Sequence, residues 1–211
     1  MNSCQCEGLE RETKKWVLED LALYRRGKPA KTTPLLINAL VSQGVEGLSL
    51  LDIGGGIGVV QIELLRSGAT AATSVDASAA YLQVAREEAA RASVEHRITY
   101  IHGDFVSLVT SIPEADVVTL DRVICCYHDV KALVSLSASK ARRLYGVVYP
   151  RSTWWVRVPL FIENMGYRLR RSPFRAFVHP SQLVDHLIRN AGLRPVYQRN
   201  TFAWQLVVYQ R

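Results

Sequence analysis

The feature that most constrains this chain is a cluster of glycines directly after a short apolar segment. Residues 50–58 read Leu-Leu-Asp-Ile-Gly-Gly-Gly-Ile-Gly, and residues 59–66 follow with the pattern of a helix. Glycine lets the backbone turn sharply and lets a ligand touch the main chain. A buried strand, a glycine turn and a helix in this order predict a ligand site at the carboxyl end of a strand in an α/β sheet.

The spacing of these glycines excludes two common phosphate-binding loops. A dinucleotide motif that begins at Gly54 requires a glycine at position 59, where this chain has Val59. A Walker loop requires Gly-Lys-Ser or Gly-Lys-Thr, which does not follow the glycines here. The spacing is instead that of Asp52, Gly54, Gly56 and Gly58.

Short apolar runs alternate with helical patterns along most of the chain, which is typical of βαβ units and a mostly parallel sheet. Strands are expected at residues 49–53, 70–75, 98–101, 116–120, 146–149, 193–198 and 204–209. Only residues 199–203 separate the last two strands, which predicts an antiparallel hairpin. We therefore predict an α/β fold: a Rossmann-like, seven-stranded, mostly parallel sheet with a C-terminal antiparallel hairpin and helices on both faces.

Two acidic positions follow the next predicted strands. Asp76 ends the second strand, 24 residues after Asp52, and a carboxylate there can accept bonds from vicinal ribose hydroxyls. His102-Gly103-Asp104-Phe105 follows the third strand. Open α/β sheets bind ligands at this carboxyl edge. Asp104 has an alternative role as the N-cap of a helix, because Asp is a favoured capping residue.

The glycine spacing and the acids together resemble class I S-adenosylmethionine-dependent methyltransferases, continuously from about residue 48 to 149. The resemblance implies S-adenosylmethionine as cofactor, with the glycine turn under its methionine and ribose parts. It implies that Asp76 binds the ribose and that Asp104 and Phe105 meet the adenine. The predicted cofactor-binding residues are Asp52, Gly54, Gly56, Gly58, Asp76, Asp104 and Phe105.

The 211 residues suit a single domain. We divide it into an N-terminal helical lid (1–47), a cofactor-binding core (48–149), an insertion expected to cover the acceptor (150–178), and a C-terminal helix and hairpin (179–211). A polar N-terminus and the lack of any apolar run of about 20 residues predict a cytoplasmic protein. The cysteines lack metal-ligand spacing, so no metal is expected. The oligomeric state stays open.

In the family that the chain resembles, the loop after the fourth strand faces the transferred methyl group. The catalytic candidates are therefore Asp121, Arg122, Tyr127 and His128. His128 could act as a general base, since its unperturbed pKa is about 6.5, or it could cap a helix. Arg122 could hold an anionic group of the acceptor, or it could form a structural ion pair with Asp121. The adjacent Cys125 and Cys126 are interpreted as small packing residues.

The segment from Arg151 to Arg175 combines aromatic residues with arginines and has one acid, Glu163. We expect it to bind the acceptor, with Trp154, Trp155 and Arg157 as candidates. The composition also suits a helix on an anionic membrane surface, single-stranded nucleic acid, or an amphipathic helix packed on the sheet.

A weaker resemblance, in residues 120–124 and 174–180, is to magnesium-protoporphyrin O-methyltransferases. The glycine turn differs from that family at Gly55 and Ile57. The predicted function is methyl transfer to a small-molecule acceptor that is large, apolar and anionic. A nucleic-acid partner is not expected, although the net charge of +7 keeps an RNA methyltransferase as an alternative. The other alternative is a binding module that has kept the fold without catalysis.

Overall fold

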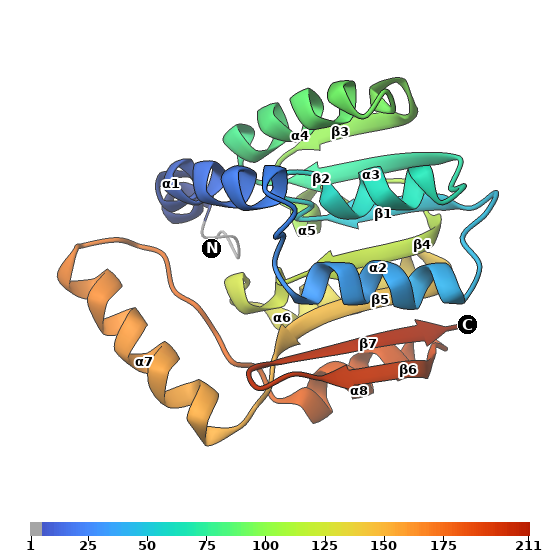
Figure 1. The fold of residues 1–211 in the computed structure, drawn as a ribbon. Helices are drawn as coiled ribbons and strands as arrows, with labels where there is room; N and C mark the ends of the chain where they lie inside the picture. The colour runs from blue at the N-terminus through green and yellow to red at the C-terminus, as the bar shows by residue number, and fades with distance from the viewer. Residues whose placement is uncertain (1–5) are drawn as a thin grey trace.

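The computed structural model describes residues 6–211 and shows one seven-stranded sheet with helices on both faces (Figure 1). The strands are β1 (Ser49–Ile53), β2 (Ala71–Asp76), β3 (Ile98–His102), β4 (Ala115–Asp121), β5 (Ala141–Pro150), β6 (Arg194–Asn200) and β7 (Trp204–Gln210). The helices are α1 (Cys6–Arg25), α2 (Thr32–Ser42), α3 (Val59–Arg66), α4 (Ala79–Arg91), α5 (Phe105–Leu108), α6 (Val130–Ser139), α7 (Trp154–Leu169) and α8 (Ser181–Asn190).

The strand order is β3-β2-β1-β4-β5-β7-β6. The first five strands of this order are parallel, and β7 runs antiparallel to both β5 and β6. The predicted fold class is therefore confirmed. The chain proceeds outward from β1 to β3 and then crosses back to β4, so the connections diverge between β1 and β4. In open α/β sheets this switch point leaves a crevice at the carboxyl ends of the strands.

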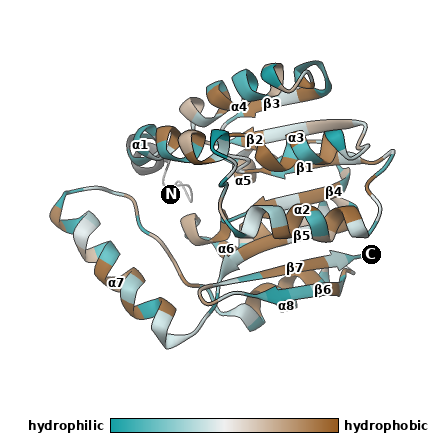
Figure 2. Ribbon diagram, viewed as in Figure 1, coloured by the Kyte–Doolittle hydropathy of each residue, from teal (hydrophilic) through white to brown (hydrophobic). Residues whose placement is uncertain are grey.

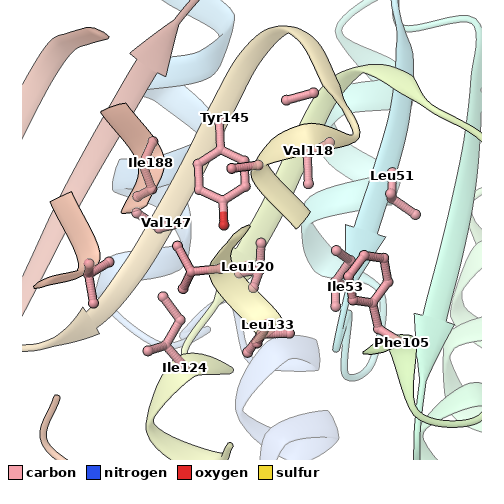
Figure 3. Close-up of a cluster of buried hydrophobic side chains, with 14 of the residues drawn as sticks. Leu51, Ile53, Phe105, Val118, Leu120, Ile124, Leu133, Tyr145, Val147 and Ile188 are labelled. Carbon is pink, nitrogen blue, oxygen red and sulfur yellow. The ribbon is translucent and has the colours of Figure 1, made fainter. Parts of the chain in front are cut away.

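Two hydrophobic cores cover the two faces of the sheet. One contains Leu36, Ile62 and Leu64 from α2 and α3, and the other contains residues of α5, α6 and α8, such as Phe105, Leu133 and Ile188. Figure 2 shows the apolar residues concentrated in the central strands, and Figure 3 shows the second core around β4 and β5. The central strands β1 and β4 are buried almost throughout, which is why their sequences are continuous apolar runs.

The segment after Pro150, which has no clear periodicity in the sequence, contains a helix of 16 residues, α7. This helix does not pack on the sheet as an amphipathic helix of the core would, and Tyr167 is its one buried residue. Figure 1 shows α7 to one side of the sheet, where a long connection returns the chain to α8. The hypothesis of a helix packed on the sheet is therefore wrong for this segment.

Inside the second core, the buried hydroxyl groups of Tyr145 and Ser137 lie 2.7 Å apart (Figure 3 shows Tyr145). The Ser137 hydroxyl also reaches the Val134 carbonyl, at 3.3 Å. We expect Ser137→Ala to destabilise the protein by about 1–3 kcal/mol, because it leaves the tyrosine hydroxyl buried without that partner. Tyr145→Phe should cost less, about 1 kcal/mol, since Ser137 retains Val134. Urea unfolding of both variants tests this order, and the reverse order would contradict it.

Candidate active site

A cavity of about 440 Å³ lies at the switch point, at the carboxyl ends of β1, β2 and β4. The glycine turn after β1 forms one side, and the residues after β4 form another. Helix α1 covers the cavity, and residues of α7 and of the connection after it close the remaining side. The volume falls within the range of ordinary ligand pockets, about 300–1,000 Å³.

The glycine turn holds a backbone that other residues would not adopt. Gly54 and Gly56 have φ angles of +64° and +56°. A Cβ atom on Gly54 would lie 2.5 Å from a methyl group of Val123, and one on Gly55 would lie 2.6 Å from a carboxylate oxygen of Asp52. The turn therefore requires glycine for both its conformation and its close packing. Gly58, with φ of +86°, is the N-cap of α3 and does not line the cavity.

Asp52 is 1% exposed and lies beneath the glycine turn. Its Oδ1 accepts a hydrogen bond of 2.7 Å from the Thr119 hydroxyl, whereas Oδ2 has no partner among the residues that the structure describes. Burial raises the pKa of Asp52 to about 7, although the bond from Thr119 acts in the opposite direction. A buried carboxylate oxygen without a partner is costly, and a ligand with positive charge would offset that cost.

Asp76 is held by the backbone on both sides. Its Oδ2 accepts a bond of 3.1 Å from the Gly56 amide, and Oδ1 accepts one of 2.8 Å from the Ser78 amide. Burial nevertheless raises the pKa of Asp76 to about 6. Each carboxylate oxygen has a second lone pair, so Asp76 can still accept bonds from a ligand.

After β4, Asp121 and Arg122 both line the cavity. The Thr33 hydroxyl donates to Asp121 Oδ2 at 2.5 Å. Arg122 Nε lies 3.8 Å from Asp121 Oδ1, too far for a hydrogen bond, and both atoms are buried without a hydrogen-bond partner among residues 6–211. Arg122 also has a φ of +63°, unusual for a side chain of this size. The ion pair between them is therefore loose enough for a ligand group to reach the guanidinium.

Charges on the cavity wall are strongly unequal. Arg122 is the one basic side chain among the described residues that line it. The acidic lining residues are Glu19, Asp20, Asp52, Asp76, Asp121 and Glu163. Such a wall lowers the free energy of a cationic ligand, the more so because part of it is buried.

Helices α1 and α7 meet over the cavity through aromatic side chains. The rings of Trp16 and Phe174 are in edge contact, with centroids 5.2 Å apart, and Tyr167 contacts Phe174 at the same distance. The Tyr167 hydroxyl donates to Glu163 at 2.9 Å. This contact encloses the ligand space, so large ligands require α1 or α7 to move.

Three of the predicted site residues have structural roles outside the cavity, namely Asp104, Phe105 and Tyr127. Asp104 caps α5 and accepts bonds from the hydroxyls of Ser107 (2.7 Å) and Tyr127 (2.9 Å). Phe105 is buried in the core. The capping role that the sequence left as an alternative for Asp104 is thus observed, and the adenine contact stays a prediction.

The remaining candidates also lie away from the cavity lining. His128 is exposed, with its ring against Phe177. Trp154, Trp155 and Arg157 belong to the first turn of α7, and none of them lines the cavity. The structure therefore does not bring these side chains together with the glycine turn.

Sequence reasoning did not identify the residues of α7 and its connection that do line the cavity. These are Leu160, Glu163, Tyr167, Phe174 and Ala176. The composition indicated that this segment contributes to the site, but only the structure shows which face of the helix points toward the cavity. The thiols of Cys125 and Cys126, 3.7 Å apart, also line the cavity, although they were interpreted as packing residues. No cluster that could hold a metal ion occurs in the described part of the chain.

Comparison with known proteins shows a likeness to methyltransferases. A family model described as a methyltransferase domain matches residues 50–144. The structure is similar to that of magnesium protoporphyrin IX methyltransferase from Synechocystis PCC 6803 with bound SAH, with a TM-score of 0.70 and 21% identity over 86% of this chain and 82% of that one. No curated protein matches the sequence.

Two further similar structures are also of methyltransferases. A candidate RNA methyltransferase from Pyrococcus horikoshii has a TM-score of 0.64 and 14% identity over 87% of this chain and 83% of that one. An O-methyltransferase family 2 protein from Planctomyces limnophilus, in complex with apigenin, has a TM-score of 0.59 and 18% identity over 85% of this chain and 60% of that one. At these identities the likeness concerns the fold, which does not select an acceptor.

The strand order and the position of the glycine turn agree with the methyltransferase fold of these solved structures. The matched residues 50–144 are those of a methyltransferase domain, and the predicted enzyme class and cofactor are confirmed.

Cofactor affinity should depend on pH through Asp76. Its pKa of about 6 means that the carboxyl is protonated below that pH and accepts hydrogen bonds poorly. We expect the affinity for S-adenosylhomocysteine to rise roughly tenfold as the pH rises from 5 to 7.5, since one pH unit corresponds to about 1.4 kcal/mol. Asp76→Asn should bind at least about tenfold more weakly at pH 7.5, with a shallower pH dependence. Calorimetric titration measures both, with Asp129→Asn, at an exposed helix cap, as the control.

Asp52 should make the ligand-free protein less stable at high pH. Its folded pKa of about 7 lies above the unfolded value, so the native state binds more protons and stability is lost as the pH rises through about 7. Asp52→Asn should therefore raise the melting temperature at pH 8 by several degrees, and have a smaller effect at pH 5, because the loss of stability builds up between the unfolded and the folded pKa. Equal melting temperatures of the variant and the unmodified protein at pH 8 would show that ionised Asp52 does not destabilise the fold.

Proposed function

We propose that this chain transfers the methyl group of S-adenosylmethionine to a small-molecule acceptor that has an apolar body and a carboxylate. The observation that carries the proposal is that one cavity is lined both by the glycine turn with Asp52 and Asp76 and by Arg122 with the inner face of α7. Cofactor-binding and acceptor-binding groups thus share one enclosed space, as group transfer requires.

The residues on the β1 and β2 side fit the cofactor. The turn from Gly54 to Gly56 offers a backbone without side chains in the way, and Asp76 has lone pairs free for ribose hydroxyls. Asp52 adds a buried negative charge close to this turn. When bound, the cofactor would supply an electrophilic methyl group attached to a cationic sulfur, and this sulfur is the leaving group when a nucleophile attacks the methyl carbon in line. The acidic wall favours that positive charge and orients it.

Arg122 is the group best suited to hold the acceptor. It is the one basic side chain on the described wall, and its Nε is buried without a hydrogen-bond partner. The planar guanidinium matches a carboxylate, and the neighbouring acids would disfavour an anion anywhere else in the cavity. A carboxylate needs no deprotonation before it attacks a methyl group, which agrees with the position of His128 outside the lining.

The apolar body of the acceptor fits between α1 and α7. Leu160, Tyr167, Phe174 and Trp16 form apolar parts of this side. A volume of about 440 Å³ is near the lower end of the usual range for ligand pockets, so a cofactor and a large acceptor together require more room. Separation of Trp16 from Phe174 would provide it, which makes this contact the entry point for the acceptor.

The two alternatives receive less support. An RNA strand carries phosphates, which the acidic wall of the enclosed cavity would repel. The likeness to a candidate RNA methyltransferase concerns the fold. A binding module without catalysis would have no need of an acceptor space that opens beside the cofactor turn, and a transfer assay distinguishes the two.

The test of the proposed function is transfer of labelled methyl groups to a panel of apolar carboxylic acids, including a porphyrin with propionate groups, beside phenols of similar size. We expect base-labile methyl esters. Arg122→Met should lower kcat/KM for the acid at least tenfold, while affinity for S-adenosylhomocysteine stays within about twofold. Arg142→Met, at an exposed position outside the cavity, is the matched control.

Two results would contradict this function. Transfer to phenols alone, unaffected by Arg122→Met, would remove the carboxylate from the proposal. A loss of S-adenosylhomocysteine affinity in Arg122→Met, equal to the loss of activity, would assign Arg122 to the cofactor.

A further inference from the structure

Helix α7 exposes a row of large apolar side chains on its outer face. Trp154, Phe161 and Leu169 are 73%, 65% and 83% exposed. Together with Val158, Ile162 and Met165 they recur at intervals of three and four residues, which places them along one side of the helix. We call these six residues the outer row. Figure 1 shows α7 beside the body of the protein, and Figure 2 shows apolar residues along its length.

The outer row is distinct from the cavity. The residues of α7 that line the cavity are Leu160, Glu163 and Tyr167, and none of them belongs to the outer row. Binding of cofactor or acceptor in the cavity therefore does not explain why the outer row is apolar.

A second apolar residue on another element extends this surface. Phe202, in the turn between β6 and β7, is 79% exposed. The indole N–H of Trp155 donates to the Phe202 carbonyl at 3.2 Å, and the two rings lie 6.3 Å apart. The start of α7 is thereby fixed to the hairpin, so the outer row and Phe202 form one surface.

The exposed charges beside the outer row are positive. Arg157 and Arg168 on α7, and Arg170 and Arg171 directly after it, are all exposed. Glu163 is the one acid of α7, and it accepts the hydrogen bond from Tyr167 at the cavity. A helix with aromatic and aliphatic residues on one side and arginines beside them is typical of helices that lie in the interface of a bilayer.

We infer that the outer row, with Phe202 and these four arginines, docks on the surface of an anionic lipid bilayer. Charge selects this occupant: each arginine is attracted to an anionic leaflet, whereas a second copy of the chain would bring its own arginines against them. Among residues 6–211, none of the helices has the length and apolar character of a bilayer-spanning segment. Because α7 also lines the cavity, docking would bring the acceptor entrance close to the lipid, a consequence that rests on the proposed function.

The experiment is co-sedimentation of the full chain with vesicles of neutral phosphatidylcholine or of phosphatidylcholine with phosphatidylglycerol. We expect binding to the anionic vesicles that weakens with added salt, and much weaker binding to the neutral ones. The double variant Phe161→Glu with Leu169→Glu should reduce binding at least tenfold. Leu18→Glu, an equally exposed leucine on α1, is the control and should bind as the unmodified protein does.

Other outcomes separate this inference from its rivals. No binding to anionic vesicles, or equal binding by the double variant, would overturn it. So would a dimer in sedimentation velocity that the double variant dissociates, because the outer row would then cover a second copy. The double variant should retain its melting temperature and its affinity for S-adenosylhomocysteine, so vesicle binding can fail without affecting the proposed methyl transfer.

Discussion

The burial of Asp52 and Asp76 at the carboxyl ends of two neighbouring parallel strands is the constraint on which the site depends. Within residues 6–211 neither carboxylate forms an ion pair, and burial raises the pKa of both, to about 7 and about 6. An ionised carboxylate in such surroundings lowers stability unless hydrogen bonds or an opposite charge compensate it. The backbone supplies part of the compensation at Asp76, through the amides of Gly56 and Ser78. In the proposed function, a cationic cofactor would supply the rest.

The local structure around these acids follows from that arrangement. The glycine turn passes so close to Asp52 that a Cβ on Gly55 would lie 2.6 Å from its carboxylate. Helix α3 begins directly after the glycine turn, and the strand order leaves a crevice beside this turn. Helix α1 completes the enclosure, where Thr13 lies within hydrogen-bonding distance of Ser78, at 2.9 Å, and Arg25 pairs with Glu88. Helix α1 is thus anchored on α4, next to the strand that carries Asp76.

The sequence allowed prediction of features that depend on local spacing. Alternating apolar runs and helical patterns predicted the seven strands, and the family resemblance carried by the glycine spacing and the acids implied the cofactor. Which neighbours a side chain meets depends on tertiary packing. Asp104 satisfies three hydrogen-bonding groups of its own surroundings, including Tyr127 from a distant loop, and no local pattern indicates that contact. The sequence also did not indicate which side of α7 faces the cavity, because apolar residues occur on both its inner and its outer sides.

The electrostatic role of the buried acids can be measured directly by the protons that leave the protein when cofactor binds. Calorimetric titration with S-adenosylmethionine at pH 6.5, in two buffers that differ in ionisation enthalpy, gives that number. If the acidic wall is shaped for a positive charge, binding favours the ionised forms of Asp52 and Asp76, and protons are released at this pH. Asp52→Asn should release fewer. Binding heats that do not depend on the buffer, or proton uptake, would contradict the role assigned to these two carboxylates.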